Sequence, residues 1–150
     1  MVLFLHLLVG AAFASKVPYP ALALVLAFLS HYFLDILPQT EYSITNIKKG
    51  KWKKTKPEFL KVALDIALGL LFIFIFSDNT FLIFAGAFLA IIPDGFSLLL
   101  AVFPKNKLLK KHGDLHFKIN AIPEYKKIPL WVSLLIQAFV VLLAIFYLLQ

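Results

Sequence analysis

Histidine and aspartate residues lie inside the apolar stretches of this chain, where ionisable side chains are costly and by default mark a functional site. His31 and Asp35 are four residues apart, so a helix would carry both on one face. His112 and His116 have the same spacing in a basic segment. Three further residues of these types lie in other apolar stretches: His6, Asp65 and Asp94. Because imidazole nitrogen and carboxylate oxygen are ligands of zinc, the pattern indicates a metal site.

The elements that must position these side chains are membrane-spanning helices. The chain has 150 residues, of which 61% are hydrophobic, and its mean hydropathy is +0.89. It has no cysteine, which excludes disulfides and thiolate ligands. A span needs about 20 apolar residues. We predict an all-α, polytopic membrane helical bundle, a single membrane domain over residues 1–150, with about five spans and a fourth span kinked at Pro93: 2–14, 19–37, 59–76, 81–103 and 129–149.

The positive charge of the chain predicts its orientation. The net charge of +7 comes from lysine alone, and 14 of the 15 lysines lie in two clusters, Lys48–Lys61 and Lys105–Lys127. With five spans both clusters lie on one side, which the positive-inside rule assigns to the cytoplasm, with the N-terminus inside and the C-terminus outside. The lysines are expected to contact anionic lipid head groups. A nucleic-acid partner is not expected, because the loops lack arginine and interleaved aromatics. The oligomeric state is left open.

Helix geometry places the ionisable residues at one depth. With a rise of about 1.5 Å per residue, His6 and Asp65 lie about two turns inside the starts of the first and third spans. His31 and Asp35 fall in the last third of the second span, and Asp94 follows about 20 Å of the fourth. All five therefore belong to the cytoplasmic half, beside the second lysine cluster.

This convergence predicts a divalent metal centre, with zinc favoured and one or two ions bound. The expected ligands are His6, His31, Asp35, Asp94, His112 and His116. Asp35 is expected either to bind the metal or to orient His31. Asp65 is the expected general base, because a carboxylate near a metal-bound water can accept its proton. Glu41 and Glu58, in contrast, are expected in solvent or at head-group level.

Short motifs along most of the chain resemble a family of small inner-membrane metal-dependent hydrolases, some of LexA-regulated type. The resemblance rests on Ser30-His31-Tyr32-Phe33-Leu34-Asp35-Ile36-Leu37-Pro38, on the early His6-Leu7-Leu8-Val9-Gly10-Ala11, on Pro93-Asp94, and on His112 and His116. That family is loosely related to the all-helical zinc phospholipase C and nuclease group. The resemblance implies a prokaryotic inner, or cytoplasmic, membrane protein with hydrolase activity.

The resulting hypothesis is metal-dependent hydrolysis of a phospholipid or another lipid-linked phosphoester at the cytoplasmic interface. Membrane lipids are therefore both the surroundings and the expected substrate. Two alternatives remain. A metal-ion or proton transporter would also use intramembrane histidine and aspartate, but it needs polar residues that continue to the outer face. A non-enzymatic membrane scaffold would use buried polar groups only to pack helices. In that case the buried polar residues should lie at scattered depths in the membrane.

Overall fold

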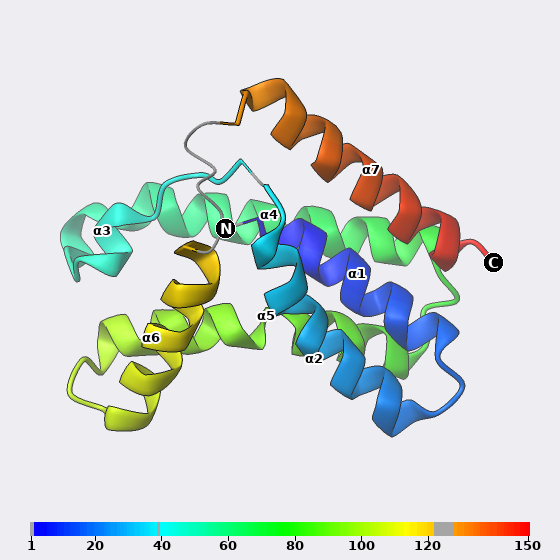
Figure 1. The fold of residues 1–150 in the computed structure, drawn as a ribbon, viewed down its shortest axis with the longest axis horizontal. Coiled ribbons are helices and arrows are strands. Elements are labelled where there is room, and N and C mark those ends of the chain that lie inside the picture. The colour runs from blue at the N-terminus through cyan, green and yellow to red at the C-terminus, as the bar shows by residue number, and fades with distance from the viewer. Residues whose placement is uncertain (1, 39, 122–127) are drawn as a thin grey trace.

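The computed structural model describes residues 2–38, 40–121 and 128–150, and the described part is helical with no strand (Figure 1). The prediction of an all-α fold is confirmed. In chain order the elements are α1 (Leu3–Lys16), α2 (Pro20–Ile36), α3 (Thr45–Lys48), the short 3₁₀ helix η1 (Trp52–Lys54), α4 (Lys56–Phe76), α5 (Phe81–Val102), α6 (Lys107–Ala121) and α7 (Leu130–Leu148).

Among the described residues, three helices are long and apolar enough to span a membrane, fewer than the five spans predicted. Helices α4, α5 and α7 have 21, 22 and 19 residues and are apolar enough to cross. Helices α1 and α2 have only 14 and 17 residues, short of the roughly 20 that a span needs. Prolines explain the bounds of α2, because Pro20 opens it and Pro38 follows its end.

Helix α5 is continuous through Pro93, the residue at which the sequence predicts a kink in the fourth span. Pro93 is nevertheless buried inside the helix, and a proline there removes one backbone donor. The carbonyl of Ala90, one turn earlier, accepts a hydrogen bond from a side chain of another helix. The proline therefore lies at the level where α5 contacts its neighbours through polar groups.

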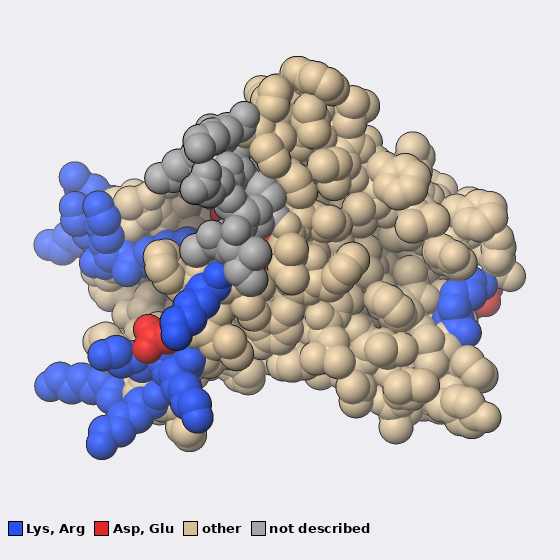
Figure 2. Space-filling view, viewed as in Figure 1, with Lys and Arg blue, Asp and Glu red and all other residues tan. Residues whose placement is uncertain are grey.

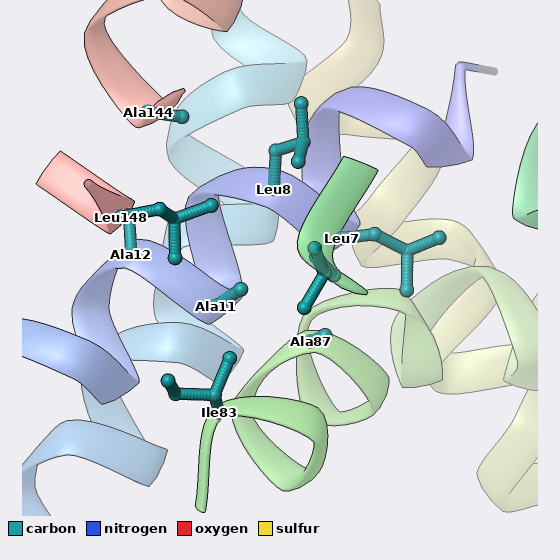
Figure 3. Packing of buried hydrophobic residues seen from close by; sticks show 9 residues of the cluster. Leu7, Leu8, Ala11, Ala12, Ile83, Ala87, Ala144 and Leu148 are labelled. Carbon is teal, nitrogen blue, oxygen red and sulfur yellow. The ribbon is translucent and has the colours of Figure 1, made fainter. Parts of the chain in front are cut away.

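Helix α1 is the centre of the bundle and packs against α2, α4, α5 and α7 (Figure 1). Leu7, Leu8 and Ala11 of α1 are completely buried and meet Ile83 and Ala87 of α5 (Figure 3). Most of α4 and α7, by contrast, exposes leucine and phenylalanine side chains to the surroundings. Exposed apolar surface on that scale is expected of helices that lipid covers.

Small residues bring α1 and α5 into close contact. A Cβ atom added to Gly10 would lie 2.5 Å from the Cβ of Ala90 and 2.6 Å from the carbonyl oxygen of Gly86. A Cβ atom added to Gly86 would lie 2.5 Å from the Cβ of Ala14. This is the spacing of small residues that lets membrane helices approach closely. It also fixes the register of the two helices, which run in opposite directions (Figure 1).

Apart from Lys16 at the end of α1, the described lysines gather at one end of the molecule, over α3, the start of α4 and α6 (Figure 2). The turn between α4 and α5 and the C-terminus lie at the other end (Figure 1). This distribution agrees with the expectation that both clusters share a side. Lys126 and Lys127, at the end of the second cluster, lie outside the described residues.

Glu58 differs from its predicted solvent exposure. It is buried, and its carboxylate accepts hydrogen bonds from the backbone N–H groups of Asn46 and Ile47 and from the Asn46 amide. These bonds attach the segment after α2 to the beginning of α4. The segment carries unpaired backbone donors at the start of α3, which explains why a carboxylate is buried against it.

Candidate metal centre

Five of the predicted site residues meet in one buried cluster: His6, His31, Asp35, Asp94 and His116. They come from α1, α2, α5 and α6, which lie next to one another (Figure 1). Each side chain is at least nine-tenths buried. The prediction that residues distant in the sequence converge is therefore supported for these five.

Spacings of four residues explain how three helices aim these side chains at one place. On α2, Ala23, Ala27, His31 and Asp35 form one buried face. On α1 the close-contact face continues from Gly10 back to His6, and on α5 it continues from Ala90 forward to Asp94. Because α1 and α5 run in opposite directions and touch at Gly10 and Ala90, the next turn brings these two ionisable residues together.

Three candidate ligand atoms lie within 3.3 Å of one another, and two of their separations are also hydrogen-bond distances. Nε2 of His31 lies 2.9 Å from Nε2 of His116 and 3.3 Å from Oδ2 of Asp35. Nε2 of His116 lies 2.8 Å from the same Oδ2. A tetrahedral ion with ligand distances of about 2.0–2.1 Å separates its ligands by about 3.3 Å. These three atoms therefore form a compact set of candidate ligands.

Asp94 and His6 lie at the edge of this set. Oδ1 of Asp94 is 3.9 Å from Nε2 of His31 and 3.7 Å from Nε2 of His116. Nε2 of His6 is 3.5 Å from Oδ1 of Asp35, the other oxygen of that carboxylate. His6, His31 and Asp94 also form a second group of three ligand atoms within 4.8 Å of one another. The two groups share His31.

Hydrogen bonds outside the cluster orient two of the imidazoles. Nδ1 of His31 is 2.8 Å from the carbonyl oxygen of Ala90, which can only accept, so this nitrogen carries the proton. Nδ1 of His116 is 3.2 Å from the hydroxyl of Ser97, and that hydroxyl also lies 3.4 Å from the carbonyl of Pro93. With both Nδ1 atoms protonated, the two Nε2 atoms direct lone pairs into the cluster, which is how metal-binding histidines are held.

Several buried polar atoms in this region have no hydrogen-bond partner among the described residues. They are both oxygens of Asp94, Nδ1 of His6 and Nδ1 of His112. A buried polar atom without a partner is destabilising, and such atoms usually indicate a water molecule or an ion. A cation bound at the Nε2 lone pairs, with a water molecule between it and the Asp94 oxygens, would satisfy both. The residues therefore fit a divalent ion.

His112, the sixth predicted ligand, lies beside the cluster and belongs to neither group. Its Nε2 is 3.1 Å from the hydroxyl of Tyr32, and its ring stacks on that of His116. Burial lowers the pKa of His112, and the neighbouring His116 and His31 lower it further. His112 is thus held neutral as a hydrogen-bonding partner of Tyr32.

Asp65, the predicted general base, is also in neither group. One of its oxygens accepts from the backbone N–H of Leu3, at 2.6 Å, and from the hydroxyl of Tyr42, at 3.0 Å. Burial raises the pKa of Tyr42, and Asp65 raises it further, so the hydroxyl stays a donor. In these contacts Asp65 neutralises the amino end of α1, where backbone donors and the helix dipole favour a carboxylate.

Sequence reasoning missed the groups that orient the imidazoles. Ser97 follows Asp94 by three residues on α5, and that spacing was the available signal. The Ala90 carbonyl gave no signal, because its role depends on how α2 packs on α5. Tyr32 stands next to His31, but its partner lies 80 residues away.

The fold and site define a class: an all-helical chain with three helices of membrane-spanning length and a buried histidine–aspartate cluster at the lysine-rich end. No family model, curated protein or solved structure matches the chain. Its function must therefore be inferred from the cluster and its surroundings.

Proposed function

We propose that the protein is an integral membrane hydrolase that uses one divalent metal ion to cleave a lipid-linked phosphoester at the cytoplasmic face. The observation that carries the proposal is the buried convergence of three imidazoles and two carboxylates from four helices. The sequence resemblance to inner-membrane metal-dependent hydrolases points the same way. Zinc is the favoured ion, because it accepts nitrogen and carboxylate ligands together.

One ion accounts for the arrangement better than two. His31 belongs to both ligand groups, but its Nδ1 donates to Ala90, which leaves a single lone pair at Nε2. We assign His31, His116 and Asp35 as ligands, since their three distances are the shortest. The charges also agree, because the two carboxylates of the cluster neutralise one divalent cation, as a low-dielectric interior requires.

The residues around the ion would divide the chemistry between them. A bound ion lowers the pKa of its water to about 7 and polarises a phosphoryl oxygen. Asp94 has two unpartnered oxygens and lies within 4 Å of two ligand nitrogens, so we assign it as the general base. Nε2 of His6 contacts Oδ1 of Asp35, and this contact orients the carboxylate so that Oδ2 points toward the ion.

Hydrolysis is favoured over transport by the distribution of buried polar residues. In the described chain the buried ionisable side chains gather toward the lysine-rich end: His6, His31, Asp35, Glu58, Asp94 and His116. Toward the other end, Gly10 and Gly86 close the contact between α1 and α5. A transport path would need polar groups through that contact.

The proposal is tested in proteoliposomes. Purified protein is reconstituted with a panel of phospholipids and polyprenyl phosphates, and release of phosphate or head group is measured with and without chelator. Chelator-sensitive release that Asp94→Asn reduces would support the proposal. If no lipid is cleaved and ions instead cross the vesicle membrane, the protein is a transporter and the proposal is wrong.

A further inference from the structure

A cavity of about 200 Å³ opens beside the candidate metal centre. Its inner end is polar and includes Asp94, Ser97 and His116. Its outer rim carries Lys48 and Glu41, both exposed. Its walls are apolar and come from α4 and α5, through Phe59, Val62, Ile66, Ile91 and Leu98. The cavity thus leads from the lysine-rich end of the molecule to two residues of the cluster.

We propose that this cavity binds the phosphate-bearing head group of an amphiphilic substrate, an inference that rests on the proposed function. Sites that enclose a whole drug-sized ligand measure about 300–1,000 Å³, so this smaller cavity accepts a head group only. The apolar chains would remain outside, along α4. That helix exposes Phe59, Leu60 and Leu64 next to the cavity wall, so a lipid can enter from the side.

Charge at the rim favours phosphate only moderately. Lys48 presents an ammonium group there, while Glu41 places a carboxylate at the same rim. The two opposite charges largely offset each other at long range. Selectivity for phosphate therefore comes mainly from the metal centre at the inner end, and Lys48 adds one exposed contact to the head group.

Substitution of Gly95 offers a way to fill the cavity without changing any of the proposed metal ligands. It lines the cavity, and a Cβ atom added there would meet no atom within 4 Å. Alanine at this position therefore fits without a clash. A leucine adds a bulky apolar side chain at this lining position and is intended to fill the volume assigned to the head group.

The test uses dodecylphosphonate, which carries the phosphate-like group and an alkyl chain but no ester to hydrolyse. Its binding to purified, metal-loaded protein in detergent is measured by calorimetry, and the metal content of each sample is determined in parallel. We expect Gly95→Leu to weaken binding at least about tenfold with the metal retained, since filling a pocket excludes its ligand. Gly95→Ala is the matched control and should bind within about twofold of the wild type. Lys48→Gln should weaken binding by about fivefold.

Equal affinity of the wild type and Gly95→Leu would overturn the inference. Loss of metal from Gly95→Leu would also overturn it, because the residue would then belong to the metal centre and not to the cavity. Binding is measured without turnover, so this experiment is independent of the hydrolysis assay. If no lipid is cleaved but dodecylphosphonate binds and Gly95→Leu prevents it, the cavity stands and the proposed reaction fails.

Discussion

At the scale of single residues, the imidazoles of His31 and His116 give the strongest support to the proposed metal ion. Their Nδ1 atoms are engaged by Ala90 and Ser97, and their Nε2 atoms lie only 2.9 Å apart. Two lone pairs that face each other repel unless a proton or a metal ion lies between them. A metal ion there would also bring its bound water beside Asp94, whose oxygens have no hydrogen-bond partner among the described residues.

Ser97→Ala should weaken metal binding by about 10–100-fold, because outer hydrogen bonds of this kind fix the ring of a metal-binding histidine. The measurement is metal affinity by competition with a chromophoric chelator. Ser77→Ala is the matched control, since the Ser77 hydroxyl makes a similar bond to the carbonyl of Ile73 far from the cluster. Unchanged affinity in Ser97→Ala would remove His116 from the ligand set.

Two aspartate variants separate the general base from a structural carboxylate. Asp94→Asn should lose about 10²-fold or more in turnover, the usual effect of removing a general base. Asp65→Asn should lose far less, because the asparagine oxygen can still accept from Leu3 and Tyr42. Lipid hydrolysis and melting temperature are measured together. The opposite result, with Asp65→Asn inactive at an unchanged melting temperature, would return the base to Asp65, as the sequence predicted.

At the scale of elements, the contact between α1 and α5 sets the geometry of the site. Gly10→Ala should lower the melting temperature, because its Cβ would lie 2.5 Å from the Cβ of Ala90 and 2.6 Å from a backbone oxygen. Overpacking of this kind costs about 1–3 kcal/mol. The same variant should also release metal more easily, since it moves His6 away from Asp94. Gly95→Ala, which adds a Cβ in open space on α5, should show neither effect.

The helices and the convergence of the site could be predicted from the sequence, but the selection among the candidate residues could not. Apolar runs and prolines indicate the helices, and spacings of four residues indicate shared faces. His112 and His116 are equivalent in that pattern, yet only His116 reaches the cluster. Asp65 has the expected depth, but helix depth says nothing about rotation, and its carboxylate instead meets the amino end of α1. The number of spans was overestimated because the apolar segments of α1 and α2 were counted as spans, although these helices have only 14 and 17 residues.

At the scale of the whole molecule, the distribution of charge predicts how the protein lies in a membrane. The wild-type chain has no cysteine, so single cysteines can be introduced one at a time and labelled. Lys51→Cys and Asn106→Cys should react with an impermeant reagent from one side only, and Asp78→Cys and Gln150→Cys from the other. The expectation holds whether or not α1 and α2 cross fully, because it depends on α4, α5 and α7. Labelling of positions 51 and 150 from the same side would be incompatible with this placement.

The most direct test of the central claim is the metal content of purified protein, measured by elemental analysis after preparation without chelator. We expect about one divalent ion per chain in the wild type and in His112→Ala, which serves as the control from the same helix. His31→Ala and His116→Ala should each lose the ion and melt at a lower temperature. A wild-type content near zero, or full retention in both of these variants, would contradict the account.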